Sequence, residues 1–378
     1  MNIQDTLLFR TDFPKQCPPS GTRGIRYSKT KGEFVMVTPD GTEHNIGVGT
    51  DDATIVVKRG ATDALSGTAL LAAYAAAKAL TPGGSALSAT NRAKLLIPPG
   101  TYLLASTLSI DTSFVDIEGL GSYKLDRGCV CSVLLTKTSG APLAVSADDV
   151  RIKGISTGPH RFAIVTSGLD NLLVENCIGS GSSSFGVNED GNGVDVSGTF
   201  VNCIGGHLSF GHGGLDYAGK ASGKFYHCVG GEYAFGGGYL ASGTFKNCKG
   251  GHMAFGGGAY GRFTGTLDGC EVDGGSAGAP ELGGPLYCEG ATIRNSRLKM
   301  TATNGHCLVL VDGNTVVENT TLLVNQGENG VPIYAATAQN VVAVHCRMNN
   351  ASKDADGLGA NVTNLVSSSG NVVSDAIT

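Results

Sequence analysis

The sequence repeats one short block in which three polar residues occupy the same position. His207, Glu232 and His252 each stand four residues after a cysteine, and each precedes an apolar residue. A carboxylate between two imidazoles can carry out acid–base chemistry, or can hold a metal ion with water completing the coordination shell. The same row can also be a solvent-facing polar ladder that only satisfies its own hydrogen bonds. The catalytic interpretation requires the three side chains to project from neighbouring strands, with Glu232 within reach of either histidine.

Further candidate catalytic residues are the loop carboxylates Asp195 and Asp216. Most glycosidases use two carboxyl groups about 5 Å or about 6.5 to 9.5 Å apart, and either loop carboxylate could pair with Glu232. A β-elimination lyase instead needs a base and a cation that neutralises a uronate, for which Arg262 is the nearest candidate. Candidate sugar-binding residues are the tyrosines near the Gly-rich turns, because aromatic faces can stack on sugar rings. These tyrosines are Tyr217, Tyr239 and Tyr260.

A block that recurs at short intervals has to position these side chains. Its clearest copies are SGTFVNCIGGHLSFG from Ser197, SGKFYHCVGGEYAFG from Ser222 and SGTFKNCKGGHMAFG from Ser242. The phase is marked by cysteines at 177, 203, 228, 248 and 270, with steps of 26, 25, 20 and 22 residues. Constant strand blocks joined by loops of variable length are typical of stacked β-coils. We therefore predict an all-β, parallel β-helix from about residue 106 to 350.

Alternation of apolar and small or polar residues predicts which side chains point inward. The expected inward set is Leu208, Phe210, Tyr233, Phe235, Met253 and Phe255. The expected outward set is His207, Ser209, Glu232, Ala234, His252 and Ala254. Because Ser209, Ala234 and Ala254 are small, they would leave the polar row accessible to a ligand.

Stacking of the coils predicts two interior columns of apolar side chains. The first contains Phe185, after a one-residue insertion, followed by Phe210, Phe235 and Phe255. The second contains Phe200, Phe225, Phe245, Leu267 and Ile293, each three residues before the cysteine or its equivalent Ser296. The residue directly before each cysteine is mostly asparagine, which tolerates left-handed backbone. We expect a corner between two strands at this point.

Composition and charge exclude some classes of protein. The chain has 378 residues, 41% of them hydrophobic, and a net charge of −5. An acidic net charge argues against a nucleic-acid partner. Apolar runs stay short of the ~18 residues of a membrane helix, and the N-terminus lacks a secretory pattern. We expect synthesis in a host cytoplasm without a secretion signal.

The 11 cysteines are expected to be free, structural thiols, because a reducing compartment disfavours disulfides. The only close pair, Cys129 and Cys131, has the wrong spacing for a zinc knuckle. Acidic clusters of the kind that bind calcium in pectate lyases are not evident. No metal or other cofactor is predicted.

The first third of the chain differs from the repeats. Residues 1–50 are expected to form a small β-rich attachment or linker segment, with a hairpin at Pro39-Asp40-Gly41. Residues 51–105 form a capping segment with a helix at 68–80, which begins at Ser66 or Thr68 and ends at Pro82-Gly83-Gly84. Residues 106–378 form the parallel β-helix with its C-terminal rungs.

The order of motifs between residues 51 and 122 resembles a known family. An acidic pair (Asp51, Asp52) before a short strand, an Ala-rich helix, the strand LIPPGTY and the strand IEGLGS follow one another. This arrangement resembles the N-terminal entry of the pectate-lyase-like right-handed β-helix superfamily, especially its phage tailspike and tail-fibre branch. The resemblance implies that the helix covers the open end of the coil. It also implies a homotrimer attached to a phage tail or baseplate through the N-terminal segment, and hence a virion component.

Three functions remain open at this stage. The first is a tailspike-like protein that binds a bacterial surface polysaccharide, with or without cleaving it. The second is a free-standing polysaccharide lyase or hydrolase. The third is a non-catalytic structural or adhesion β-helix. Fold does not decide among them.

Overall fold

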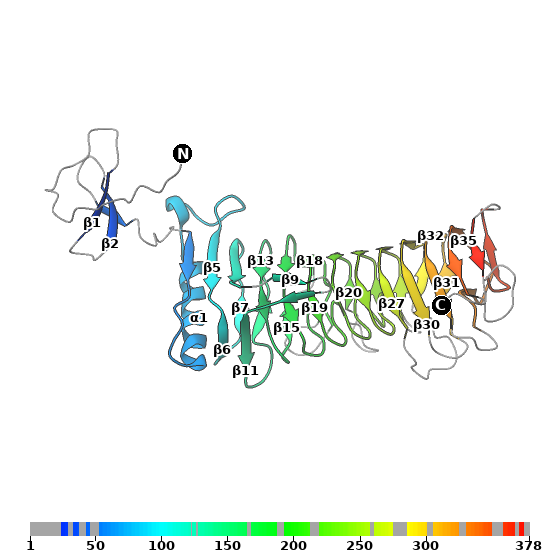
Figure 1. Cartoon of the computed structure of the whole chain (residues 1–378), viewed down its shortest axis with the longest axis horizontal. Helices are drawn as coiled ribbons and strands as arrows, with labels where there is room; N and C mark the ends of the chain where they lie inside the picture. Colours follow the sequence, from blue (N-terminus) through cyan, green and yellow to red (C-terminus); the bar gives the residue numbers. More distant parts are fainter. Residues whose placement is uncertain are drawn as a thin grey trace, which may run out of the picture.

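The chain is an elongated parallel β-coil closed at one end by a helix, as the computed structural model shows (Figure 1). The structure describes residues 24–28, 33–37, 43–45, 53–121, 123–125, 128–164, 168–186, 193–211, 219–257, 261–274, 286–300, 305–324, 330–349, 358–366 and 370–373. The predicted parallel β-helix is therefore confirmed. Parallel pairing begins earlier than residue 106, because β4 (Thr54–Val56) already pairs with β5 (Ala93–Ile97).

Three walls of parallel strands enclose the core. The first wall is a 13-stranded sheet. Beyond β4 and β5 it contains β8 (Val115–Gly119), β13 (Arg151–Lys153), β16 (Leu173–Glu175), β18 (Thr199–Val201), β21 (Lys224–Tyr226), β23 (Thr244–Lys246), β26 (Thr266–Asp268), β29 (Thr292–Arg294), β32 (Thr315–Glu318), β35 (Gln339–Val344) and β37 (Val362–Asn364).

The second wall consists of a five-stranded and a six-stranded sheet, linked by single bridges through Val229. Its strands are β6 (Gly100–Leu104), β11 (Val133–Lys137), β14 (Ile155–Ser156), β17 (Ile178–Gly179), β19 (Ile204–Gly205), β24 (Lys249–Gly250), β27 (Glu271–Asp273), β30 (Arg297–Met300), β33 (Thr321–Val324), β36 (Arg347–Met348) and β38 (Val372–Val373).

The third wall consists of a three-stranded and a six-stranded sheet. Its strands are β7 (Leu108–Ile110), β12 (Leu143–Val145), β15 (Phe162–Ile164), β20 (Lys220–Ala221), β22 (Leu240–Ala241), β25 (Arg262–Phe263), β28 (Leu286–Glu289), β31 (Leu308–Asp312) and β34 (Ile333–Ala335).

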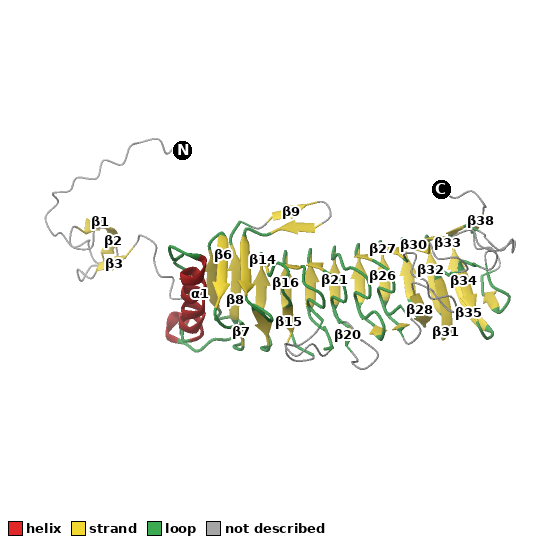
Figure 2. Ribbon diagram, turned by 90° about the horizontal axis from the view of Figure 1, so that it is seen from below, coloured by secondary structure: helices red, strands yellow, loops and turns green. Residues whose placement is uncertain are grey.

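Two antiparallel elements lie outside the coil. The N-terminal sheet contains β1 (Gly24–Ser28), β2 (Glu33–Val37) and β3 (Glu43–Asn45), so the expected N-terminal hairpin is present between β2 and β3. A second hairpin, β9 (Tyr123–Leu125) and β10 (Gly128–Val130), projects from the side of the coil (Figure 2).

The interior contains the two predicted columns of stacked side chains. Phe185, Phe210, Phe235 and Phe255 are fully buried, and consecutive ring centroids lie 5.0, 4.8 and 4.6 Å apart. The second column is also present, since strand register pairs Phe200 with Phe225, Phe225 with Phe245, Phe245 with Leu267, and Leu267 with Ile293. Rings of the two columns meet edge to face. One continuous aromatic core therefore runs through the repeat region.

The corner between the first and second walls is also as predicted. Asn176, Asn202, His227 and Asn247 have φ between 51° and 56°, in the left-handed region. The following cysteine points inward, and its thiol donates to a carbonyl of the preceding coil, as Cys248 does to Phe225 O at 3.3 Å. This hydrogen bond explains the recurrence of a small donor side chain at one position. The thiols of Cys203, Cys228, Cys248 and Cys270 are buried and free.

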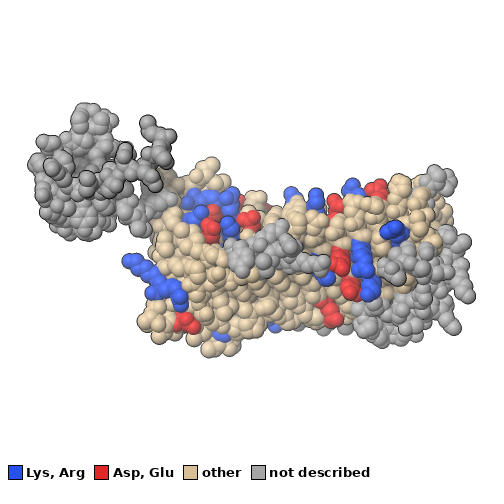
Figure 3. Space-filling model, in the orientation of Figure 1, with Lys and Arg blue, Asp and Glu red and all other residues tan. Residues whose placement is uncertain are grey.

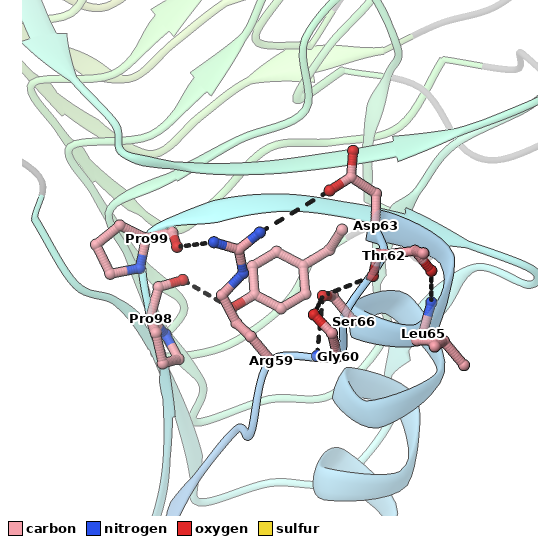
Figure 4. Close-up of polar contacts among 9 residues, drawn as sticks. Arg59, Gly60, Thr62, Asp63, Leu65, Ser66, Pro98 and Pro99 are labelled. Atoms are coloured by element: carbon pink, nitrogen blue, oxygen red, sulfur yellow. Dashed lines mark hydrogen bonds and ion pairs between the residues drawn. The ribbon is translucent and has the colours of Figure 1, made fainter.

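The capping helix is longer at its start than the sequence indicated. Helix α1 spans Asp63–Lys78, and Thr62, not Ser66 or Thr68, is its N-cap. The Thr62 hydroxyl accepts a hydrogen bond from the Leu65 N–H at 3.2 Å, and Ser66 donates back to Thr62 O at 2.9 Å (Figure 4). A short 3-10 turn, η1 (Pro82–Gly84), follows. The expected cap was placed too late because Asp63-Ala64-Leu65 carries no strong helix periodicity of its own.

One apolar stripe of α1 closes the end of the coil. Leu70, Tyr74 and Ala77 are buried there. Gly67 is required at its position, because a Cβ atom there would lie 2.0 Å from Leu103 O of β6. By length and composition alone, Asp63–Gly84 could cross a membrane, with a mean hydropathy of 1.2. Within this segment Leu70, Tyr74 and Ala77 are buried against the end of the coil, whereas Leu65 is 55% exposed.

Candidate functional site

The proposed row of polar residues is only partly formed. His207 Nε2 and Glu232 Oε2 lie 3.6 Å apart, and both side chains are about half exposed, at 47% and 58%. Backbone hydrogen bonding sets this distance, since Leu208 N–H donates to Glu232 O at 2.8 Å and fixes the two turns one rung apart. A protonated His207 can therefore form a solvent-exposed ion pair with Glu232, at a separation longer than a direct hydrogen bond.

His252 does not belong to this exposed pair. Its side chain is 5% exposed, and its Nδ1 is hydrogen-bonded to Gly274 O. The ring packs edge to face against Tyr233 with 6.1 Å between centroids, and Nε2 has no hydrogen-bond partner. The expectation that His252 points outward beside Glu232 is wrong. The predicted three-residue row reduces to a pair.

The error has a backbone cause. Residues 207–211, 232–238 and 252–256 form turns and not strands, and two non-glycine residues in each turn have positive φ. Tyr233 (φ 54°) and Phe235 (φ 53°) are the pair in the middle copy. Because a strand period of two does not apply there, Leu208, Tyr233 and Met253 are partly exposed. Ser209, Ala234 and Ala254 are fully buried, opposite to the prediction.

A second group of charged residues lies on the outer surface of the third wall. Asp195, Lys220, Leu240 and Arg262 occupy successive rungs, because Val196 bridges Ala221, β20 pairs with β22 and β22 pairs with β25. On the next strand, β28, the register partner of Arg262 is Tyr287, and Glu289 lies two residues further along the strand, within ion-pair distance of Arg262. We call Asp195, Lys220, Leu240, Arg262 and Glu289 the outer row.

Ion pairs join the residues at each end of the outer row. Lys220 Nζ lies 3.9 Å from Asp195 Oδ2, and Arg262 Nε lies 4.0 Å from Glu289 Oε2. All four side chains remain one third to one half exposed. Long, solvent-screened pairs of this kind contribute at most about 1 kcal/mol. The two cations therefore remain available to a competing anion.

The structure separates the carboxylates that the sequence offered as a pair. Asp195 lies on the third wall beside Lys220, whereas Glu232 lies beside His207 in the turn that precedes that wall. Tyr239 is 38% exposed and directly precedes Leu240 of the outer row. Asp216, Tyr217 and Tyr260 lie outside the described residues.

Sequence reasoning missed four residues on the third wall. They are Lys220, Glu289, His306 and Tyr334. Lys220 and Glu289 could have been found by aligning the strands that follow the Gly-rich loops, but the variable loop lengths hide that register. His306 and Tyr334 lie on neighbouring rungs and stack in parallel with 4.2 Å between ring centroids.

His306 is neutral at physiological pH. Burial lowers the pKa of its imidazole, and a hydrogen bond with Val331 O opposes this shift only in part. His306 Nδ1 lies 3.2 Å from both Val331 O and Val331 N, so the tautomer decides whether it donates to the carbonyl or accepts from the N–H. Its stacking and hydrogen bonding fit a structural role within the third wall.

No group of three or more His, Cys, Asp or Glu side chains within the described ranges could hold a metal ion. Burial raises the pKa of the Cys307 thiol to about 12 and raises that of Cys288 further. Thiols of this kind are inert as nucleophiles. Acidic and basic side chains are intermixed on the face shown in Figure 3, which has no extended patch of one sign.

Comparison with known proteins gives only distant similarities. No family model matches the sequence, and no curated protein matches it. Among solved structures, the Dettilon tailspike protein gp208 matches with a TM-score of 0.33 at 11% identity, covering 85% of this chain and 68% of that one.

Two further structures match at the same level. The ORF18 protein of Geobacillus virus E2 has a TM-score of 0.38 at 13% identity, with coverage of 83% and 68%. The A-module of the Azotobacter vinelandii mannuronan C-5 epimerase AlgE6 has a TM-score of 0.34 at 10% identity, with coverage of 82% and 94%. Similarities this weak carry no information on substrate or activity.

Proposed function

We propose that the chain is a phage tailspike or tail-fibre-like protein that binds a bacterial surface polysaccharide along its third wall. The observation that carries the proposal is the outer row. Lys220, Leu240 and Arg262 project from consecutive parallel strands, so chemically different groups are offered at intervals of about 4.8 Å along the coil. A linear polymer lying along the axis can contact all of them at once.

Neighbouring features support a ligand at this surface. Tyr239 is exposed beside Leu240 and provides an aromatic ring next to the two cations. An exposed aromatic side chain beside charged donors suits a sugar, which presents apolar ring faces and polar edges. The resemblance of residues 51–122 to the tailspike branch supports the same class of ligand. It also supports a homotrimer, and attachment to a phage tail through residues 1–50.

Cleavage of the polysaccharide is a second candidate, carried by the His207–Glu232 pair. Both groups are about half exposed and 3.6 Å apart, at ion-pair distance when His207 is protonated. A base and an acid in this arrangement could serve a lyase or a hydrolase. Glu232→Gln would abolish cleavage without lowering stability, because an exposed isosteric change disturbs no packing. Arg262 and the outer row would then hold the substrate.

Incubation of the full chain with a panel of purified bacterial surface polysaccharides tests both functions. Binding is read by glycan array and calorimetry, hydrolysis by new reducing ends, and elimination by the absorbance of unsaturated uronates. Binding that is lost in the Lys220→Gln/Arg262→Gln double variant but kept in Lys246→Gln, on the first wall, supports the proposal. Binding to no polysaccharide would refute it. A monomer at micromolar concentration, measured by light scattering, would refute the proposed homotrimer.

A further inference from the structure

We infer that the polysaccharide bound on the third wall carries anionic groups separated by an uncharged sugar. This inference rests on the proposed polysaccharide binding and adds the charge pattern of the ligand. The outer row presents in register a carboxylate (Asp195), a cation (Lys220), an apolar residue (Leu240) and a cation (Arg262). The next strand adds a carboxylate (Glu289), two residues along from the partner of Arg262 and 4.0 Å from its Nε. The sign of the charge therefore changes along the coil in a defined sequence.

The distance between the two cations determines how far apart two anionic groups of the ligand must be to contact both cations at once. Lys220 pairs in register with Leu240, and Leu240 with Arg262, so the cations are two rungs apart. Two rungs of a parallel sheet span about 10 Å, which is close to the length of a disaccharide. A polymer with one carboxylate on every second sugar can place consecutive carboxylates on Lys220 and Arg262. Its uncharged sugar then covers Leu240, beside Tyr239.

The flanking carboxylates act against other charge patterns. A polymer with an anion on every sugar would place anionic groups opposite Asp195 and Glu289 when Lys220 and Arg262 are occupied. Like charges in contact weaken binding, and such repulsion is a common source of specificity. A neutral polymer would leave Lys220 and Arg262 in their ion pairs with Asp195 and Glu289. The two cations would therefore add nothing to its binding affinity. The row therefore favours a ligand with alternating anionic and uncharged sugars.

Accessibility of the cations is compatible with this role. Lys220 and Arg262 are each 37% exposed, and their partner carboxylates lie at the limit of ion-pair distance. An anionic sugar can approach each cation from solvent without a change in the backbone. Charge-assisted hydrogen bonds to a carboxylate then replace the long pairs.

The test uses the full chain and three classes of purified polysaccharide on one array. The classes carry an anion on every second sugar (hyaluronan and bacterial polymers of the same pattern), an anion on every sugar (polygalacturonate), or no charge (dextran and neutral bacterial polymers). We expect the protein to bind mainly polysaccharides of the first class. Lys220→Gln and Arg262→Gln should each weaken it by about tenfold, the loss of one charge-assisted hydrogen bond. Lys246→Gln, on the first wall, should leave it unchanged.

A second pair of variants tests the flanking carboxylates directly. Asp195→Asn and Glu289→Gln should increase the affinity for polymers charged on every sugar and leave hyaluronan-type binding nearly unchanged. Tightest binding to neutral or fully charged polymers, or affinities insensitive to Lys220 and Arg262, would overturn the inference while leaving polysaccharide binding intact. If the protein binds no polymer of any class, both the proposed function and this inference are refuted.

Discussion

Removal of the Phe235 ring provides the most direct test of the aromatic core. Phe235 is fully buried between Phe210 and Phe255, with ring centroids 4.8 and 4.6 Å away, and it meets Phe225 and Phe245 edge to face at 5.6 Å. Truncation of a buried phenylalanine to alanine costs about 3 to 5 kcal/mol of unfolding free energy. The expected cost lies at the upper end of that range.

The reason is that the surrounding backbone cannot collapse into the cavity. Phe235 N–H donates to Ser209 O at 2.9 Å, and Phe255 N–H donates to Ala234 O at 3.0 Å. These hydrogen bonds hold the neighbouring rungs at the spacing of the parallel coil. The four ring contacts also contribute beyond the buried area, by about 0.5 to 1.5 kcal/mol per aromatic pair.

Guanidinium unfolding, followed by circular dichroism and tyrosine fluorescence, measures this loss. Phe235→Leu is the matched control, because it keeps most of the apolar volume although it loses the ring contacts, and it should cost less than Phe235→Ala. If Phe235→Ala cost no more than Phe235→Leu, the columns would not form one closely packed core, and every assignment of residues to rungs would need revision.

Three further predictions concern the corner, the turns and pH. Cys248→Ser should lower the free energy of unfolding by no more than about 1 kcal/mol. The reason is that Ser296 occupies the equivalent position and donates to Arg294 O at 2.6 Å. Guanidinium unfolding measures the loss, and a loss as large as that of Cys248→Leu would contradict the prediction. Tyr233 has a φ of 54°, so its glycine variant should be more stable than its alanine variant by about 1 kcal/mol. At Thr244, a strand residue, the alanine variant should be the more stable of the two. Thermal melts of the four variants test this order of stability. His306 has a lowered pKa in the folded state, so it contributes stability above its ordinary pKa of 6.5. This contribution is lost as the pH falls, because the unfolded chain then binds a proton that the folded chain does not. His306→Gln should therefore lose less stability than the unchanged chain between about pH 7 and about pH 5, and equal losses in pH-dependent unfolding would exclude the effect.

The sequence by itself determined the solenoid, its phase and its two interior columns of apolar side chains. Phe200, Phe225 and Phe245 recur three residues before a cysteine, and only a stacked coil can bury all of them in one column. The asparagines before the cysteines indicated the corner, since few other residues accept left-handed backbone at low cost. Such features are local, so a repeat unit carries them wherever it stands in the chain.

Only the tertiary structure decided which polar residues meet. The turns at 207–211, 232–238 and 252–256 adopt left-handed backbone at partly apolar positions, which places Tyr233 near the surface and Ala234 inside. Alternation cannot reveal this, because it assumes an extended strand. Loops of different lengths likewise hide the register that brings Lys220 beside Asp195 and Arg262 beside Glu289. Contacts between rungs depend on how each loop returns the chain to the coil, and sequence spacing does not encode that distance.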